Sequence, residues 1–291
     1  MDTERFRVAE GSKVDLRDHP TDYTGEYKEK DDAVKDLEKN IKELSKLQET
    51  LYAENRRSLL IVFQAMDAAG KDSAIEHVMS GINPQGCRVT SFKSPSTEEL
   101  DHDYLWRCHK EAPRRGMIGI FNRSHYEEVL VVKVHPQYLA SQRLPDSPDT
   151  NKDFWKDRYR QIRDWEAMLE ANGTQVIKFF LHVSLEEQKQ RFLDRINEPD
   201  KNWKFSAGDA KERAFWNDYM KAYEDALAAT STDASPWYII PADKKWFARL
   251  AVSTVLVEAM NAMKLSFPQV TEAMKADLLE AKKILEAEPS A

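Results

Sequence analysis

The sequence predicts an α/β fold with a doubly wound parallel sheet, and two observations support this prediction. Five short apolar runs recur along the 291 residues, as is typical of strands that a parallel sheet buries on both faces. Segments with helical spacing of apolar residues separate these runs, and such alternation favours right-handed crossovers within one sheet. No internal repeat and no Gly/Ser-rich linker interrupts the pattern.

The expected elements follow from this alternation in chain order. Strands are expected at 58–63, 87–92, 117–121, 175–183 and 237–240. Helices are expected at 28–55, 72–80, 97–111, 124–134, 151–172, 185–197, 207–229, 244–263 and 270–286. The Pro-containing segment Arg143–Thr150 is predicted to be a loop within the domain.

Three regions are expected along the chain. Residues 1–55 should form an irregular arm and an amphipathic helix, residues 56–265 a core with a helical lid at about 185–215, and residues 266–291 a C-terminal helix. The amphipathic pattern of the first helix comes from apolar residues at steps of three and four, namely Val34, Leu37, Ile41, Leu44, Leu47 and Leu51. Packing of this helix on the core is the simplest interpretation, and an oligomer interface is the alternative.

Composition and charge exclude several classes of protein. The chain has 43 Lys and Arg against 50 Asp and Glu, and its net charge of −7 argues against a general nucleic-acid-binding protein. The longest apolar runs, Ser58–Phe63 and Val176–Val183, are far shorter than the roughly 20 residues of a membrane span. Two cysteines do not make a disulfide framework, and the first residues lack the apolar run of a secretory signal. We therefore expect a cytoplasmic protein with neither a membrane nor a nucleic-acid partner.

The most informative segment, QAMDAAGKDS at residues 64–73, follows the first strand. Small residues let backbone N–H groups face phosphate oxygens, the next helix adds its N-terminal donors, and Lys71 adds a full charge. The match to GxxxxGK[ST] is imperfect, because Ala65 replaces the first Gly and Asp72 replaces the Ser/Thr. The candidate phosphate-binding positions are Ala68, Ala69, Gly70, Asp72 and Ser73. An ordinary turn capped by Asp72 is the alternative.

Carboxylates in this segment could hold a hard cation. Magnesium prefers carboxylate oxygens, phosphates and water as ligands, and Asp67 and Asp72 both offer carboxylates. We expect Mg2+, with Mn2+ as the alternative, to bind at Asp67.

A second polar cluster follows the third strand, at the edge where open α/β sheets bind ligands. Asn122 occupies the position where many phosphate-loop enzymes carry a magnesium-binding acid, and its amide oxygen is a weaker, neutral ligand. Arg123 is suitably placed to neutralise a transferring phosphate. Glu127 and Glu128 are candidate nucleotide-binding residues, with a solvated helix face as the alternative. Asn122 and Ser124 could instead cap the next helix.

Basic residues form a third set of candidates. Arg191 and Arg195 lie at i and i+4 of one predicted helix, so they share a face. A lid with such residues would supply charge and exclude water only when substrate is present. Lys93, Lys244 and Lys245 directly follow or flank strand ends. A solvated charged helix, and single surface charges, are the alternatives.

Together these segments resemble the family-2 polyphosphate kinases. Four stretches carry the resemblance: FQAMDAAGKDSAIEHVMSG, GMIGIFNRSHYEEVLVVKVHP, RFLDRINEPDKNWKFSAGDAKERAFWNDYMKAYEDAL and SPWYIIPADKKWFARL. The likeness runs from about Asp15 to Met263. The wording NRSHY at residues 122–126 resembles subclass III, because the other subclasses begin this word with Asp.

The resemblance implies a thymidylate-kinase-like phosphate-loop fold with a helical lid. It implies reversible phosphoryl transfer from inorganic polyphosphate to nucleoside mono- and diphosphates, so that AMP becomes ADP and then ATP. Adenine nucleotides are expected, with guanine nucleotides as an alternative, and the enzyme is expected to be a homodimer or homotetramer.

The resemblance also assigns residues by position. The catalytic positions carried over are Asp67, Lys71, Asn122 and Arg123. Arg191 and Arg195 match the lid, and Lys93, Lys244 and Lys245 are expected to line the path of the polyphosphate. Two other functions remain open: an ATP-dependent nucleoside monophosphate kinase of the same fold, and a nucleotide-binding scaffold that assembles through the helix at Val34–Leu51.

Overall fold

A five-stranded parallel sheet forms the centre of the computed structural model, which describes residues 1–145, 152–204 and 206–288. The strands are β1 (Ser58–Gln64), β2 (Cys87–Ser91), β3 (Ile118–Asn122), β4 (Thr174–His182) and β5 (Trp237–Pro241). They lie in the order β2-β3-β1-β4-β5, and every neighbouring pair is parallel. The predicted doubly wound α/β fold is confirmed.

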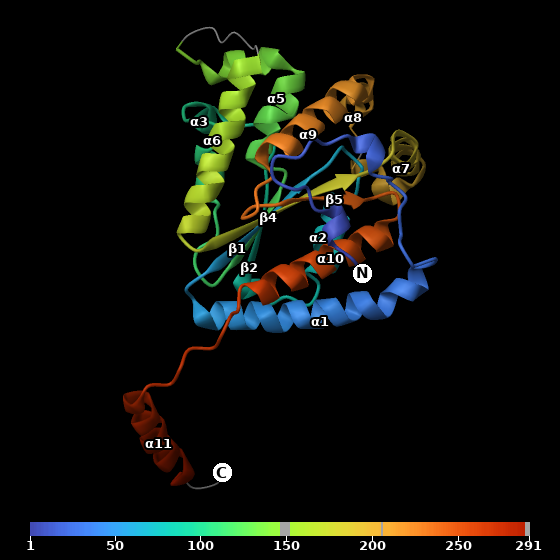
Figure 1. Ribbon diagram of the computed structural model, residues 1–291. Helices are drawn as coiled ribbons and strands as arrows, with labels where there is room; N and C mark the ends of the chain where they lie inside the picture. Colours follow the sequence, from blue (N-terminus) through green and yellow to red (C-terminus); the bar gives the residue numbers. More distant parts are fainter. Residues whose placement is uncertain (146–151, 205, 289–291) are drawn as a thin grey trace.

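Helices cover both faces of this sheet (Figure 1). One face carries α1 (Lys30–Glu54), α2 (Lys71–Val78) and α10 (Lys245–Ala262). The opposite face carries α5 (Val131–Val134), α6 (Lys152–Ala171) and α9 (Trp216–Thr230). The remaining helices are α3 (Thr97–Leu100), α4 (Trp106–Lys110), α7 (Leu185–Asn197), α8 (Ala207–Glu212) and α11 (Glu272–Glu286).

The first helix packs on the core, as the simplest interpretation of its pattern predicts. Its apolar stripe is buried at Leu44 and Leu51, and α1 lies along α10 in Figure 1. The Asn40 amide donates to the hydroxyls of Ser253 and Thr254 on α10, at 3.0 and 2.9 Å. The N-terminal arm is also attached, because the Val8 amide donates to the Trp237 carbonyl at 2.9 Å.

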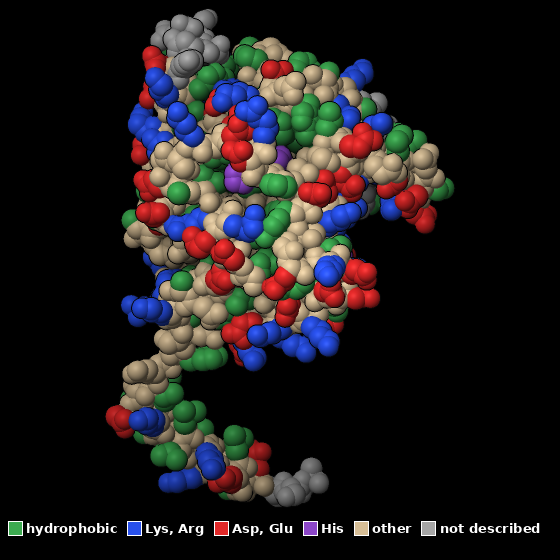
Figure 2. All heavy atoms as spheres, turned by 45° about the vertical axis from the view of Figure 1, so that its right-hand side comes forward, with side chains coloured by type: hydrophobic (Ala, Val, Ile, Leu, Met, Phe, Trp, Pro, Cys, Tyr) green, Lys and Arg blue, Asp and Glu red, His purple; other side chains and the backbone are tan. Residues whose placement is uncertain are grey.

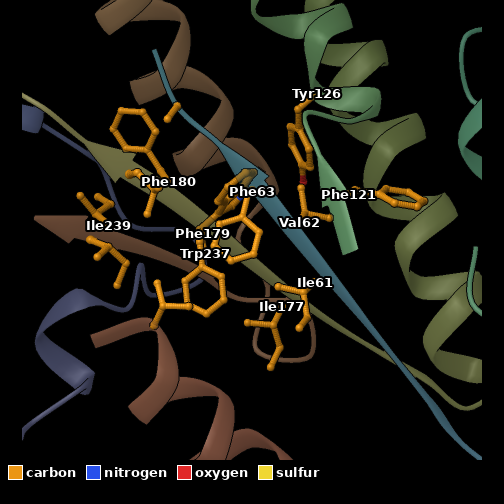
Figure 3. Packing of buried hydrophobic residues seen from close by; sticks show 14 of the residues in the cluster. Ile61, Val62, Phe63, Phe121, Tyr126, Ile177, Phe179, Phe180, Trp237 and Ile239 are labelled. Atoms are coloured by element: carbon orange, nitrogen blue, oxygen red, sulfur yellow. The ribbon is translucent and has the colours of Figure 1, made fainter. Parts of the chain in front are cut away.

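The continuous apolar character of the inner strands is explained by burial on both faces, whereas the residues of the edge strand β2 are exposed or partly exposed. All seven residues of β1 are buried. Aromatic side chains fill the space beside the central strands, with the rings of Phe63 and Phe179 stacked at a centroid distance of 5.3 Å (Figure 3). Cys87 and Cys108 are free thiols.

One charged pair lies inside this core. The Lys178 ammonium, on β4, donates to the Glu166 carboxylate of α6 at 2.5 Å, and both side chains are almost fully buried. Tyr126 also donates to Glu166, at 2.8 Å. Burial alone would raise the pKa of Glu166, but the charges and hydrogen bonds of Lys178 and His125 together outweigh burial and hold that pKa below its ordinary value.

Three of the predicted helices are divided in the structure. The segment 97–111 forms α3 and α4, because the Asp103 carboxylate accepts from the amides of Leu105 and Trp106 and starts a new helix. The segment 124–134 forms a 3-10 helix, His125–Val129, followed by the single turn of α5. The segment 207–229 forms α8, a 3-10 helix over Arg213–Phe215, and α9. The predicted loop at 143–150 lies partly outside the described residues.

Helix α11 stands away from the rest of the molecule in Figure 1. Its apolar side chains are largely exposed, including Met274 at 50%, Leu278 at 60% and Leu285 at 66%, and green side chains are visible along it in Figure 2. Within the described chain, no helix combines the length and the apolar character that crossing a bilayer would need.

Candidate active site

The candidate residues meet at the carboxyl edge of the sheet. The loop 65–70 leaves β1 and enters α2 at Lys71. Asn122 ends the neighbouring strand β3 in register with Phe63, and the Arg123 amide donates to the Phe63 carbonyl at 3.0 Å. Parallel pairing of β1 and β3 therefore brings the Gly-Lys turn and the Asn-Arg pair side by side.

The loop has the backbone of an anion-binding turn. Ala68 and Gly70 both have positive φ angles, of 62° and 106°. Glycine is needed at position 70, because a φ of 106° is strained for any residue with a Cβ. The amides of the first turn of α2 have no partner within the helix, so they are available to phosphate oxygens.

Lys71 lies buried at the base of this loop. Its ammonium donates to the carbonyls of Ala65 at 2.8 Å and Met66 at 3.3 Å. Burial, and then the neighbouring Arg123 charge, lower the pKa of Lys71 to about 8. Lys71 therefore stays mostly charged at neutral pH, but it loses its proton at a much lower pH than an ordinary lysine.

Arg123 joins two carboxylates across the site. Its guanidinium donates to Asp67 on the loop and to Glu127 at 3.4 Å. Burial opposes the charged form, but Glu127 and Asp67 outweigh it and raise the pKa of Arg123. Beside this group the Asn122 amide donates to the Asp72 carboxylate at 2.5 Å. The four residues predicted to be catalytic thus surround one small region.

A cavity of about 400 Å³ opens beside Arg123. Its walls include Lys93 and Phe92 from the segment after β2, with Tyr104 and Tyr138 opposite. The volume falls in the range of small-molecule sites, and aromatic walls with a few charged groups are typical of them. Glu127 lines the cavity next to Arg123.

Glu128 differs from the expectation that it binds nucleotide. Its carboxylate is buried and pairs with Arg158 at 2.9 Å, and the Gln142 amide donates to it at 2.6 Å. Because these contacts lie within the wall of the cavity, Glu128 shapes that wall and holds Arg158 in place.

The other side of the loop, toward α10, is basic. Arg249 donates to the Ser73 hydroxyl at 2.6 Å. Burial lowers the pKa of Lys245, and the charges of Arg191, Lys201 and Arg249 lower it further. Lys244 is the N-cap residue of α10. Sequence reasoning missed Arg249, although it falls in the stretch SPWYIIPADKKWFARL that carries the resemblance.

The structure corrects the expected role of Arg191. The predicted lid arginine is only 5% exposed and lies against the phosphate loop. Its five N–H groups meet five acceptors: Glu187, the carbonyls of Ala68 and Ala69, and those of Ala242 and Asp243. No donor remains for a phosphate, so Arg191 does not close over the site in this arrangement.

One residue of α7 and one of α8 approach the same centre. The Asp209 carboxylate of α8 has a raised pKa, through burial and then through its proximity to Asp67. The charge of Arg195 acts in the opposite direction on Asp209, so Arg195 also faces this region. Sequence reasoning did not select Asp209, whose only signal was its place inside the resembling stretch.

Comparison with known proteins agrees with this geometry. The sequence model of the polyphosphate kinase 2 (PPK2) family matches residues 27–268. The chain belongs to the polyphosphate kinase 2 family.

Several relatives align with this PPK2 chain over almost their whole length. It is 54% identical, over 97% of its length and 98% of the relative's, to an ADP-polyphosphate phosphotransferase of Rhodopseudomonas palustris. It is 43% identical to an AMP/ADP-polyphosphate phosphotransferase of Meiothermus ruber, over 95% and 99% of the two chains. The crystal structure of polyphosphate kinase 2 from Arthrobacter aurescens TC1 matches with a TM-score of 0.85 and 39% identity, over 95% and 96% of the chains.

The side chains of the PPK2 site alone do not supply a complete set of metal ligands. No group of three His, Cys, Asp or Glu side chains that could hold a metal occurs among the described residues. The carboxylates of Asp67 and Asp72 nevertheless face the loop region where phosphates would lie. This set fits Mg2+, which is commonly bound by one or two carboxylates together with substrate phosphates and water.

Proposed function

We propose that this chain transfers phosphoryl groups from inorganic polyphosphate to AMP and to ADP, and that the reaction is reversible. One observation carries the proposal: Lys71 and Arg123 stand between an aromatic-walled cavity and a basic surface, with Asp67 beside them. The names of the relatives from Rhodopseudomonas palustris and Meiothermus ruber support polyphosphate as donor and ADP or AMP as acceptor.

Phosphoryl transfer between these substrates requires mainly positive charge and correct alignment of donor and acceptor. Donor and acceptor are both polyanions, so their repulsion is the obstacle to reaction. The attacking phosphate oxygen of the acceptor is already ionised and needs little help from a general base. Phosphoryl transfer is catalysed largely by alignment and by charge stabilisation, and Lys71 and Arg123 provide both.

Asp67 is the proposed ligand of Mg2+, with Mn2+ as an alternative. When bound, the cation would neutralise phosphate charge between donor and acceptor. Arg123 holds the Asp67 carboxylate from the cavity side, and Asn122 holds Asp72. These contacts orient both carboxylates before a cation arrives.

Each substrate is proposed to bind on its own side of the loop. The nucleotide, adenine in preference to guanine, occupies the cavity with Lys93 and Glu127 in its wall. Polyphosphate runs along the basic side past Lys245 and Arg249. Lys93 therefore serves the nucleotide phosphates and not the polymer, which revises the expected path. Assembly into a homodimer or homotetramer stays part of the proposal.

The deciding experiment is a donor and acceptor test with purified protein and Mg2+. AMP and ADP are each incubated with polyphosphate and, separately, AMP with ATP, and products are separated chromatographically. We expect ADP and then ATP from AMP and polyphosphate. ADP formed only with ATP as donor would establish a nucleoside monophosphate kinase, and nucleotide binding without turnover would establish a scaffold.

Two variants connect this activity to the site. Lys71→Ala and Asp67→Ala should each lower turnover by about 10²–10³-fold, the usual cost of one lost transition-state contact. Lys39→Ala, an exposed change on α1, is the matched control and should keep wild-type turnover. Near-normal turnover in either site variant, with circular dichroism unchanged, would contradict the assignment.

A further inference from the structure

Three successive carbonyl groups of the phosphate loop are held by one helix. The Gln188 amide on α7 donates to the Asp67 carbonyl at 3.0 Å. Arg191, one turn further along α7, donates to the carbonyls of Ala68 at 3.1 Å and Ala69 at 2.7 Å. Both side chains are buried, so these contacts are shielded from water.

The planarity of the peptide gives these contacts a consequence on the other side of the loop. In a trans peptide the C=O and N–H groups point in opposite directions. The amides that share a peptide plane with the Asp67 and Ala69 carbonyls are those of Ala68 and Gly70. With both carbonyls held toward α7, these two N–H groups face away from it, as an anion-binding turn requires.

This loop conformation needs external support. Ala68 has a φ of 62°, in the left-handed region that is unfavourable for a residue with a Cβ. Its own carbonyl is one of the two loop carbonyls that Arg191 binds. Arg191 also donates to the carbonyls of Ala242 and Asp243 after β5, so it connects the loop to a second fixed segment.

Gln188 is itself held in one orientation. Arg213, in the 3-10 helix after α8, donates to the Gln188 side-chain carbonyl at 2.6 Å and to the Leu185 carbonyl at 3.1 Å. Because that oxygen is occupied by a donor, the amide nitrogen is the end that faces Asp67. Gln188 therefore connects the 3-10 helix after α8 to the backbone of Asp67.

We propose that Gln188 and Arg191 are positioning residues that keep the amides of the phosphate loop directed at the polyphosphate, and that α7 is the fixed support of this loop. The inference rests on the proposed function, because it takes the phosphates as the ligand of the loop. In this arrangement neither side chain touches the substrate, and each acts through the loop backbone.

The proposal predicts a specific response to substitution. Gln188→Met keeps the size of the side chain and removes its donor, and Arg191→Met removes the charge together with the donors that span two pairs of carbonyls. Both variants should bind tripolyphosphate about tenfold more weakly. Gln190→Met, an exposed change on the same helix, is the matched control and should bind like the wild type.

The dependence of binding on salt separates positioning from direct contact. A side chain that pairs with phosphate adds an ionic contact that salt screens, so its loss lowers the slope of log Kd against log salt concentration. Calorimetry at several salt concentrations should give wild-type slopes for Gln188→Met and Arg191→Met despite their weaker binding. Thermal unfolding of each variant shows that it is folded when binding is measured.

Each outcome bears on one conclusion. Wild-type affinity in both variants would overturn the positioning role while leaving the proposed function in place. Weaker binding by Arg191→Met with a reduced slope would assign Arg191 to direct phosphate contact and overturn its positioning role. Failure of the wild type to bind tripolyphosphate or to use polyphosphate would overturn the proposed function together with this inference.

Discussion

Burial lowers the pKa of a single residue, Lys71, at the centre of the site. Its acceptors among the described residues are two backbone carbonyls, and burial lowers its pKa to about 8. A polyanion beside it would favour the charged form and raise this pKa again. Near and above pH 8, the free enzyme and the enzyme with bound phosphate should therefore differ in their protonation at Lys71.

The pH dependence of activity follows from this pKa. As pH rises through about 8, free enzyme loses the Lys71 charge, so kcat/KM for polyphosphate should fall on the alkaline side. In Lys71→Arg, which stays charged, this alkaline decline should be absent, even if the rate is lower throughout. Initial rates between pH 6.5 and 9.5, at roughly equal ionic strength, provide the measurement. The same decline in both proteins would exclude Lys71 as its source.

Lys71 should make the free energy of unfolding increase with pH, whereas the activity decreases with pH. Its folded-state pKa of about 8 lies below the ordinary 10.5, so between these values the unfolded chain binds more protons than the folded chain. Stability then rises with pH across this window. The loss of activity above pH 8 is therefore not expected to reflect unfolding.

Sequence reasoning at the residue scale succeeded where chain order fixes position. Residues at strand ends, such as Asn122 and Arg123, must lie at the carboxyl edge of a parallel sheet. It failed for Arg191, because the spacing of i and i+4 says that two residues share a helix face but not what that face contacts. The pairing of Glu128 with Arg158 was missed for a similar reason, since Arg158 is distant in sequence.

At the scale of elements, the pair formed by β4 and α6 depends on one charged contact. Lys178 and Glu166 lie in the core, where a lone charge is costly. Glu166 also accepts from Tyr126. The contact therefore fixes α6 against the sheet and positions the segment that follows Arg123.

Breaking this contact should destabilise the protein strongly. Lys178→Met leaves the Glu166 carboxylate buried without its counter-charge, and the expected loss is about 3–5 kcal/mol of unfolding free energy. The double variant Lys178→Met/Glu166→Gln should recover part of that loss, because no buried charge remains. Urea unfolding of the three proteins measures both values. A double variant less stable than Lys178→Met would contradict this account.

Element boundaries were harder to predict than element types. All five strands occur near their predicted positions. For β1, β3 and β4, burial on both faces leaves a continuous apolar run, whereas the edge strand β2 is exposed or partly exposed along its length. The segment 97–111 looked like one helix because its apolar spacing continues past Asp103. A side chain that accepts hydrogen bonds from backbone amides can end a helix locally. The spacing of apolar residues does not show where this happens.

At the scale of the whole molecule, α11 is the element with the least support. Its apolar residues are more than half exposed, as at Leu278 and Leu285, and Figure 1 shows it apart from the domain. The sequence predicted the helix correctly, since its spacing is amphipathic. Spacing alone does not reveal whether a helix packs on its own domain.

Removal of α11 should leave the domain intact. A chain ending at Ser266 keeps α10 and the partly buried Leu265, so its melting temperature should stay within about 2 °C of the full chain. Polyphosphate-dependent turnover should remain within about twofold. Calorimetry, turnover and light scattering on both chains test this. A smaller oligomer with a lower melting temperature would instead make α11 an assembly element.

The cavity and the basic side lie on different sides of Lys71. This arrangement has a consequence for the use of a long polyphosphate chain. The cavity lies toward β2 and β3, and Lys245 follows β5 at the opposite end of the sheet order. Because the proposed function gives each substrate its own side of the loop, the phosphorylated nucleotide can depart while the polymer stays bound. Such a ternary complex permits processive use of one chain by successive acceptors, and double-reciprocal rate plots would intersect instead of running parallel.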